Sequence, residues 1–371
     1  MADLFVFNPE NDIALACAST NFTAPKNALL MRRCCDSVMA WLTMNEDDYV
    51  LVSRDPSDNW KNQIRAVRGH LPQFVKDAHG LKINRVVPWG WSRVLKNRLL
   101  ELGVDESILP SDDHLIRIRH LSHRRTSLHI NQYLQDVGVD IPPLAIEAND
   151  ISAIMYYLAR HDRVVIKAPW SSSGRGVVDS ALLNRQMFID RCEGVIRHQG
   201  SIMVEKFLDR VLDFAMLFEL NGGRCRYIGL SRFVNSRTGS YDGNIVCSQA
   251  IHHYAICRHI DADRLTQVRH RLMSALEKII GAAYDGYCGV DMMIYNDENF
   301  TPRLAPCIEI NLRTTMGIIA ESIGKYFITD ENQSYLLRTD YAHGKIKQKQ
   351  LLPVLDLTPP ADFTTRLYQL K

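Results

Sequence analysis

A lysine at the end of an apolar run, followed by a short serine- and glycine-rich segment, lies near the middle of the chain. Residues 164–166 read Val-Val-Ile, Lys167 comes next, and residues 171–176 read Ser-Ser-Ser-Gly-Arg-Gly. The apolar run predicts a buried strand, so Lys167 would emerge where the strand ends. Backbone N–H groups of a glycine-bearing loop can close over anionic oxygens, and an ammonium group neutralises phosphate charge. The pattern predicts a polyphosphate site; the alternative is a lysine that reaches solvent.

A second segment, far along the chain, carries side chains that suit a metal ion. Asp291 interrupts the apolar stretch 289–294, and Glu309 and Asn311 alternate with isoleucines in residues 307–312. Residues two apart on a strand point to the same face, so Glu309 and Asn311 would present oxygen atoms side by side. Two carboxylates and an amide are hard ligands that suit Mg²⁺ bridging phosphate oxygens, with Mn²⁺ as an alternative. The three residues are therefore the predicted metal ligands.

The order of these segments resembles that of the ATP-grasp superfamily, over roughly residues 120–325. The segments that carry the resemblance are the lysine strand, the serine/glycine segment, Val204-Glu205-Lys206-Phe207-Leu208, Gly289-Val290-Asp291 and Glu309-Ile310-Asn311. Members of this superfamily bind Mg-ATP between two α+β subdomains and mostly join a carboxylate to an amine. The pattern is similar to that of carboxylate–amine ligases such as D-alanine–D-alanine ligase, and to biotin carboxylase-like proteins.

The resemblance implies which residues contact ATP. In such proteins a mobile flap covers the phosphates, an extended hinge offers backbone groups to the adenine edge, and a second carboxylate takes the ribose hydroxyls. Here the flap would be Ser172, Ser173, Gly174, Arg175 and Gly176, the hinge Glu205, Lys206, Phe207 and Leu208, and the ribose ligand Asp213. Glu205 would bind at the adenine edge, whereas Lys206 and Leu208 would act through backbone atoms.

Further basic residues are implied near the phosphates. Arg124 or Arg125, at the start of a predicted helix over residues 123–137, would reach them; the alternative is two arginines on a solvated helix face. Arg232 follows an apolar strand at a position where relatives place a phosphate ligand, with a structural salt bridge as the rival interpretation. Residues 238–244 form a glycine-bearing turn cluster of the kind that makes a mobile lid.

Arg313 completes the predicted chemistry. It lies two residues beyond Asn311, on the same face of the predicted strand. A guanidinium group matches a carboxylate or a phosphoryl group in geometry, so Arg313 could clamp a substrate carboxylate or an acyl-phosphate. Together with Lys167 and Arg232 it forms the predicted catalytic set.

The implied reaction is attack of a substrate carboxylate on the γ-phosphate, followed by displacement of phosphate by an amine. Positioning and electrostatic stabilisation suffice for such a phosphoryl transfer, so none of the 13 histidines or nine cysteines is needed as a nucleophile. Two alternatives remain open at this point. The scaffold could phosphorylate a hydroxyl as a small-molecule kinase, or the chain could be a nucleotide-binding regulatory protein without turnover.

The N-terminal part of the chain predicts a small parallel α/β domain. Short apolar runs at residues 4–7, 49–52 and 83–87 alternate with helical spacing at 27–42 and 91–102. Ligands often bind at the carboxyl ends of such strands. The turns that would lie there, at residues 8–12 and 88–92, are candidate substrate positions; the alternative is a turn, a helix cap and packed tryptophans. No residue in these turns is predicted to be catalytic.

The predicted fold class combines α/β and α+β: the small parallel domain is followed by a two-subdomain ATP-grasp fold. Helical spacing marks residues 151–160, 182–196 and 265–283, and strands are predicted at 201–208, 212–220 and 224–233. The predicted division is an N-terminal α/β domain over 1–120, a small subdomain with the flap over 121–200, a subdomain with the metal site over 201–345, and a C-terminal extension over 346–371.

Composition limits the partners. The chain has 371 residues, 23% of them charged, and a net charge of +2, which favours neither disorder nor a broad nucleic-acid-binding surface. No CxxC pair occurs, so free thiols in a reducing compartment are expected. No basic leader and no run of 18 apolar residues occurs, so no membrane association and a cytoplasmic location are expected. The expected partners are small-molecule or peptide substrates bearing a carboxylate and an amine, with a homodimer as an option.

Overall fold

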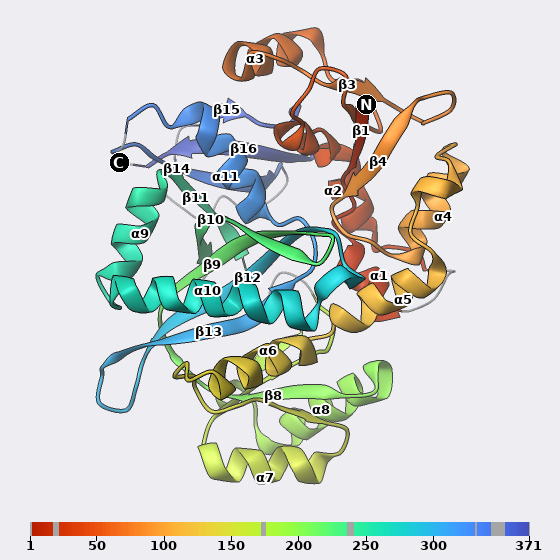
Figure 1. The fold of residues 1–371 in the computed structure, drawn as a ribbon. Helices are drawn as coiled ribbons and strands as arrows, with labels where there is room; N and C mark the ends of the chain where they lie inside the picture. The colour runs from red at the N-terminus through yellow and green to blue at the C-terminus, as the bar shows by residue number, and fades with distance from the viewer. Residues whose placement is uncertain are drawn as a thin grey trace.

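The computed structural model describes residues 2–17, 22–171, 176–235, 241–330, 332–342 and 353–370. Three β-sheets organise this part of the chain. Figure 1 shows the N-terminal sheet at the upper right, a large sheet in the centre and upper left, and a small sheet with its two helices as a separate lobe at the bottom. No helix of the described ranges has the length and apolar character to cross a bilayer.

The N-terminal sheet is parallel and has the order β3-β2-β1-β4. Its strands are β1 (Ala2–Val6), β2 (Tyr49–Leu51), β3 (Gln73–Val75) and β4 (Ile83–Pro88). Its helices are α1 (Asn11–Cys17), α2 (Lys26–Cys35), α3 (Asp58–Arg68) and α4 (Arg93–Glu101). The helix expected over residues 27–42 is α-helical only as α2 and continues as the 3₁₀ helix Asp36–Leu42. The strand order reverses between β1 and β4, and such a point in an open α/β sheet is where ligands bind.

The small sheet is antiparallel and has the order β5-β8-β6-β7. It consists of β5 (Ile146–Ala148), β6 (Val164–Lys167), β7 (Val177–Asp179) and β8 (Ile202–Lys206), and it packs against α7 (Ile151–His161) and α8 (Arg185–Gln199). Two helices, α5 (Asp112–Leu121) and α6 (Arg125–Asp136), connect it to the N-terminal domain. Alternate residues of β6, Val164 and Ile166, are buried in the core of this lobe, and Lys167 ends the strand as predicted.

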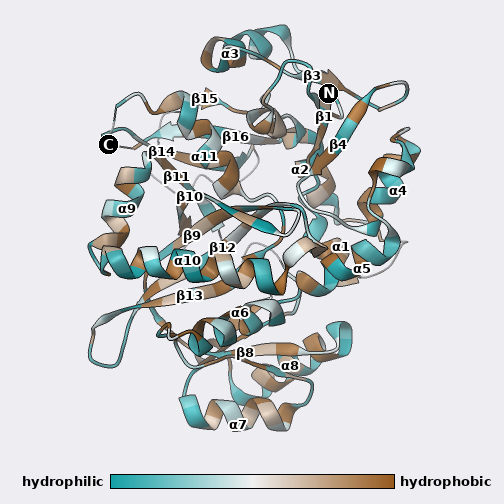
Figure 2. Ribbon diagram, in the orientation of Figure 1, coloured by the Kyte–Doolittle hydropathy of each residue, from teal (hydrophilic) through white to brown (hydrophobic). Residues whose placement is uncertain are grey.

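The large sheet has the order β13-β12-β9-β10-β11-β14-β16-β15. Its strands are β9 (Asp209–Asn221), β10 (Arg224–Asn235), β11 (Tyr241–Cys247), β12 (Gly286–Asn296), β13 (Pro302–Asn311), β14 (Ser334–Tyr341), β15 (Pro353–Asp356) and β16 (Phe363–Gln369). Three helices accompany it: α9 (Gln249–Cys257), α10 (Ala262–Ile279) and α11 (Met316–Phe327). Figure 2 shows hydrophobic residues along β8 and β13, whereas α10 alternates between hydrophobic and hydrophilic residues as an amphipathic helix does.

The two faces of the large sheet pack against different parts of the molecule. Phe214 and Met216 of β9 join the core formed with α6 and α10. Ala215 and Leu217 point to the opposite face, where they join α11 and residues of the N-terminal domain in a second core. Because strand residues alternate between faces, this packing fixes which side chains of β9, β10 and β12 lie next to the N-terminal domain.

Two segments differ from their expected form. Residues 241–244, expected within a turn cluster, belong to strand β11, which pairs with β10 and β14; residues 236–240 lie outside the described ranges. Residues 353–370, expected as an extension, contribute β15 and β16 to the large sheet. The predicted fold class is confirmed: a parallel α/β domain precedes two further sheet-based units.

Candidate active site

Three oxygen-bearing side chains lie together where the end of strand β13 pairs with the middle of strand β12. Asp291 and Glu309 are register partners on these neighbouring antiparallel strands, and Asn311 follows on the same face. The amide Nδ2 of Asn311 donates a hydrogen bond to Oδ2 of Asp291 at 3.1 Å. Strand alternation therefore brings the three predicted metal ligands together, because directly opposite residues on paired strands point to the same face.

The electrostatics of this cluster are those of a cation site. Burial, and then the neighbouring carboxylate of Glu309, raise the pKa of Asp291 to about 7; Arg313 and the hydrogen bond from Asn311 act in the opposite direction. A second carboxylate within Coulomb range disfavours the ionised form unless a cation compensates for it. The carboxylates of Asp291 and Glu309 thus repel each other, and a divalent cation between them would relieve this repulsion.

Arg124 joins this cluster to the loop after the lysine strand. Its Nη2 donates to both oxygens of Glu309, at 2.8 and 2.9 Å, and its Nη1 donates to the carbonyl of Ala168 and to Oγ of Ser171. Arg124 is only 6% exposed. Arg125 points elsewhere and pairs with Glu147 at 2.8 Å. Of the two arginines that the sequence could not separate, Arg124 is the one at the cluster.

Lys167 and Glu205 face each other on adjacent strands. Lys167 is 6% exposed, and its Nζ lies 2.5 Å from Oε2 of Glu205. β6 and β8 are antiparallel neighbours, which brings the predicted phosphate ligand next to the predicted adenine-edge residue. Lys167 also lies within Coulomb range of Asp213 on the large sheet. The lysine is therefore near both sheets that would enclose a nucleotide.

The remaining hinge residues follow β8. Lys206 pairs with Glu298 at 3.0 Å. The guanidinium of Arg163 lies over the Phe207 ring, with its Cζ 3.4 Å from the ring centroid. The backbone N–H of Phe207 donates to the carbonyl of Arg163 at 3.0 Å. Leu208, which follows, is half-buried between β8 and β9. This extended segment links the small sheet to the large one.

Asp213 lies on β9, near Asp291. It accepts hydrogen bonds from Arg210 at 3.0 Å and from Asn235 at 2.8 Å. Burial raises the pKa of Asp213, against the effect of Arg210, and the charge of Asp213 contributes in turn to the raised pKa of Asp291. The residue predicted to hold the ribose is thus close enough to the predicted metal ligand Asp291 to affect its pKa.

Arg232 differs from its expected position. Ser231 of β10 faces α11, because its hydroxyl would lie 3.0 Å from a Cβ placed on Gly317. Successive residues of a strand point to opposite faces, so Arg232 points away from α11. There Nε of Arg232 donates to Nδ1 of His252 on α9 at 3.2 Å. Asp291 and Ala215 are register partners on the Ser231 side of the sheet. Strand alternation therefore separates Arg232 from the carboxylate cluster, and its contacts are those of a structural arginine.

Arg313 is held by Asp12, a residue of the 8–12 turn, in which no catalytic residue is predicted from the sequence. Its Nε lies 3.0 Å from both oxygens of Asp12, and its Nη2 donates to Oδ1 of Asn311 at 2.9 Å. Asp12 lies in the first turn of α1, within the segment at the carboxyl end of β1. The sequence does indicate that Asp12 lies near the carboxyl end of β1, where ligands often bind. It does not indicate that Asp12 contacts Arg313, which is 301 positions away.

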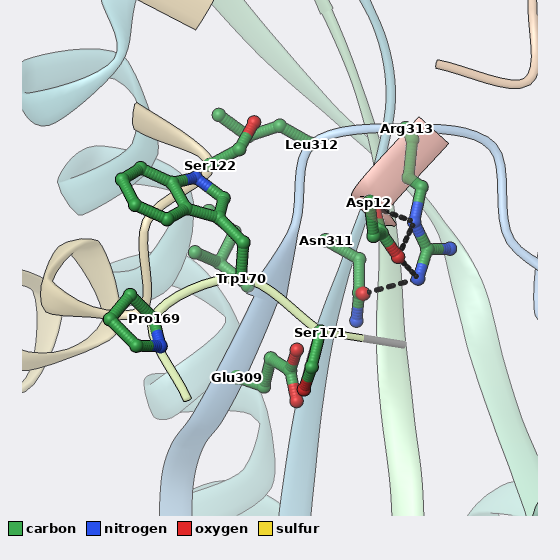
Figure 3. A pocket seen from close by; sticks show the side chains of 10 residues that line it. Asp12, Ser122, Pro169, Trp170, Ser171, Glu309, Asn311, Leu312 and Arg313 are labelled. Atoms are coloured by element: carbon green, nitrogen blue, oxygen red, sulfur yellow. Dashed lines mark hydrogen bonds and ion pairs between the residues drawn. The ribbon is translucent and has the colours of Figure 1, made fainter. Parts of the chain in front are cut away.

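A polar pocket lies between these groups and the loop after Lys167 (Figure 3). Figure 3 shows Asp12 and Asn311 contacting the Arg313 guanidinium on one side, with Pro169 and Trp170 on the other and Ser171 beside Glu309. Lys167 and Asp291 do not line it. The predicted flap residues Ser172, Ser173, Gly174 and Arg175 lie outside the described residues, and Gly176 has a positive φ of 76°.

The donor set fits magnesium. In the described ranges, no group of three or more His, Cys, Asp or Glu side chains is arranged to hold a metal ion, so a metal here depends on the Asn311 amide beside Asp291 and Glu309. Oxygen-only ligands of this kind suit Mg²⁺, which keeps waters and binds through one or two carboxylates plus phosphate oxygens. Arg124 pairs with Glu309 in this structure, so metal binding would compete with that ion pair.

No family model and no curated protein matches this sequence. Solved structures match its fold. A biotin carboxylase complex with β,γ-ATP from Campylobacter jejuni is 12% identical, with a TM-score of 0.53 over 100% of this chain and 88% of that chain. N5-carboxyaminoimidazole synthetase from Staphylococcus aureus is 11% identical, with a TM-score of 0.51 over 100% of this chain and 93% of that chain.

Phosphoribosylamine–glycine ligase from Thermotoga maritima gives the same TM-score of 0.51 at 12% identity, over 100% of this chain and 91% of that chain. The fold of the chain is the ATP-grasp fold, as the ordered motifs predicted. At these identities the likeness concerns the fold alone.

Proposed function

We propose that this protein is an ATP-dependent ligase that activates a carboxylate as an acyl-phosphate and transfers the acyl group to an amine, releasing ADP and phosphate. The observation that carries the proposal is the Arg124 bridge, which connects the segment after Lys167 with Glu309 on the large sheet. Two remote segments, one suited to phosphate and one suited to Mg²⁺, thereby border a single polar pocket.

Mg²⁺, when bound, would neutralise charge on the phosphate oxygens and help to align them for transfer. Asp291, Glu309 and Asn311 are the residues that would hold it. Lys167, released from Glu205, would contact the phosphates, and Arg124, released from Glu309, could do the same. Both cations are buried, and a charged contact in a site of low dielectric is stronger than in water.

Arg313 would bind the reacting carboxylate or the acyl-phosphate. Its guanidinium lines the pocket beside Asn311. Because Asp12 and Asn311 hold Nε and Nη2, the anion would bind at Nη1, which in this structure donates to the carbonyl of Thr314 at 3.2 Å. The solved structures of similar fold include, by name, two synthetase or ligase proteins and a biotin carboxylase. These names support the choice of a ligase.

The test is a screen of acyl donors against amines that reports ADP release, followed by mass spectrometry of the product. We expect ADP and phosphate to appear only when both substrates are present. A stable phosphoester from a single substrate would replace the proposal with a kinase. Tight ATP binding without turnover across the panel would indicate a regulatory protein.

A Lys167→Ala variant gives a test that needs no second substrate. Losing one such charged contact weakens nucleotide affinity or transfer by about a hundredfold. Isothermal titration with Mg-ATP measures this directly. Unchanged affinity for Mg-ATP, together with unchanged turnover of the substrates found by the screen, would remove Lys167 from the site.

A further inference from the structure

The N-terminal domain contacts the candidate site at the residues that follow strand β13. Asp12 pairs with Arg313, the backbone N–H of Thr314 donates to the carbonyl of Trp89 at 2.7 Å, and Thr314 Oγ1 donates to the carbonyl of Pro88 at 3.3 Å. Each partner in the N-terminal domain follows or ends β1 or β4. The loop after β13 is therefore docked at the point where the strand order of the N-terminal sheet reverses.

Close packing supports this contact. A Cβ added to Gly90 would lie 2.5 Å from Nδ2 of Asn11 and 3.2 Å from Cβ of Arg313. Asn8 holds Gly90 through two hydrogen bonds. Nδ2 of Asn8 donates to the carbonyl of Gly90 at 2.8 Å, and the backbone N–H of Gly90 donates to Oδ1 of Asn8 at 3.3 Å. The backbone that follows β4 thus approaches Arg313 so closely that a side chain at position 90 would be crowded.

The Asp12–Arg313 pair has the geometry that fixes a guanidinium group. Nε lies 3.0 Å from both carboxylate oxygens and Nη2 lies 2.9 Å from Oδ2. The side chains are only 17% and 15% exposed, so solvent competes little for these contacts. Nη2 also contacts Asn311, and a long side chain held at two points loses the rotamer freedom that it would have in open solvent.

From this geometry we infer that Asp12 is a positioning residue: it holds Arg313 in the orientation in which its guanidinium faces the pocket. The inference rests on the proposed role of Arg313 in the ligase reaction. It makes the N-terminal domain a part of the reaction site, since the carboxylate that orients Arg313 lies on α1. A misplacement of about 1 Å in such a group can cost a hundredfold in rate, so the effect of losing Asp12 should be large.

The first test reports orientation and needs no substrate. In protein labelled with ¹⁵N-arginine, exchange of the Arg313 Nε–H proton with solvent is measured by NMR, with Arg313→Lys identifying the resonance. We expect Asp12→Asn to speed this exchange by about tenfold or more, because a charge-assisted hydrogen bond is replaced by a weaker one. Asp12→Glu, which keeps the charge, should exchange more slowly than Asp12→Asn. Equal exchange in wild type and Asp12→Asn would overturn the inference.

The second test measures turnover with the substrates found by the screen. Asp12→Asn should lower kcat/KM for the acyl donor by about tenfold or more and leave Mg-ATP affinity within about twofold. Asp3→Asn is the matched control, because it removes another carboxylate–arginine pair of the N-terminal domain, with Arg85, away from the pocket. Wild-type kcat/KM in Asp12→Asn would overturn the inference.

Loss of Mg-ATP binding in Asp12→Asn would also contradict a role confined to Arg313. If the wild type itself binds no Mg-ATP, the proposed function fails, while the exchange experiment still decides whether Asp12 orients Arg313.

Discussion

Three carboxylates in and around the candidate site are each paired with a basic side chain. Glu309 accepts from Arg124, Asp12 accepts from Arg313, and Glu205 accepts from Lys167. Removing one partner of such a buried pair leaves an uncompensated charge, which is more costly than the loss of an exposed pair. Of the predicted metal ligands, Glu309 is paired with a cation of the protein itself, whereas Asp291 accepts a hydrogen bond from the neutral Asn311 amide.

Glu309 is the residue whose loss should separate binding of metal from folding. We expect Glu309→Gln to lower Mg²⁺-dependent turnover by about a hundredfold or more, because one of the two carboxylates of the proposed Mg²⁺ site is removed. The amide can still accept a hydrogen bond from Arg124, so the fold should persist, although the uncompensated charge of Arg124 should lower the unfolding temperature. ADP release is measured as a function of Mg²⁺ concentration. Glu219→Gln, on the same sheet but paired with exposed Arg226, is the control.

A buried carboxylate in the N-terminal domain gives a pH-dependent stability. Burial raises the pKa of Asp36 from 3.8 to about 6, although the backbone N–H of Ser53 donates to it and acts in the opposite direction. A raised folded-state pKa means that the stabilising contribution is present below the unfolded pKa and is lost as pH rises through about 6. Asp36→Asn keeps an acceptor for Ser53 without a titrating proton.

We expect the wild type to lose stability relative to Asp36→Asn by about 1 to 2 kcal/mol on going from about pH 5 to about pH 8. Urea unfolding of both proteins at the two pH values measures this difference. A constant difference would show that Asp36 does not titrate in this range.

Among the contacts between secondary-structure elements, the junction of the residues after β4 with the loop after β13 is closely packed. Gly90 follows β4, and a side chain there would meet Asn11 and the stem of Arg313. Neither can move far, because Asn11 is 2% exposed and Arg313 is held by Asp12. The need for glycine here is therefore one of space, since Gly90 is not among the residues with a positive φ.

Gly90→Ala should destabilise the protein by about 1 to 3 kcal/mol through overpacking, and it should impair turnover by displacing Arg313. Thermal unfolding and ADP release are measured together. Gly194→Ala is the control: it lies within α8 with no atom within 4 Å of the added Cβ, so it should be neutral or stabilising by up to about 1 kcal/mol. Equal stability of both variants would contradict the close packing at Gly90.

In the described part of the molecule, one hydrophobic core is shared between two units and another lies within a single lobe. The N-terminal domain and the large sheet share one core, in which Phe7 and Trp41 pack with Leu217, Ile319 and Leu337. Two indole N–H groups of the N-terminal domain reach the end of β15 and the residue after it: Trp60 donates to the carbonyl of Asp356, and Trp41 donates to that of Leu357. The small sheet with α7 and α8 instead has a core of its own.

Hydrogen exchange should reflect this division. We expect amides of β6 and β8 to exchange through an opening of the small lobe that leaves the other sheets protected, since cooperative units follow shared cores. Amides of β1 and β14, which belong to elements packed on the shared core, should exchange only on global unfolding. Mass spectrometry of peptides after timed exchange measures both groups. Equal protection of β6 and β14 would show that the lobe does not open separately.

Much of the site follows from local periodicity in the sequence. Alternation along a strand placed Glu309 and Asn311 on one face, and the apolar run before Lys167 placed the lysine at a strand end, because side-chain direction in a strand depends only on parity. The same alternation places Arg232 on the face of β10 opposite the carboxylate cluster, but the sequence alone does not show which face of β10 packs against α11. The parallel N-terminal sheet likewise follows from short apolar runs separated by helical spacing.

Contacts between remote segments required the folded chain. Arg124 rather than Arg125 reaches Glu309, Asp12 holds Arg313, and residues 363–369 pair with β14. Nothing in the sequence around these residues indicates these partners. These pairs are separated by up to 301 positions along the chain. Their formation depends on how whole sheets dock against each other, and docking is fixed by packing of the shared core, which local spacing does not encode.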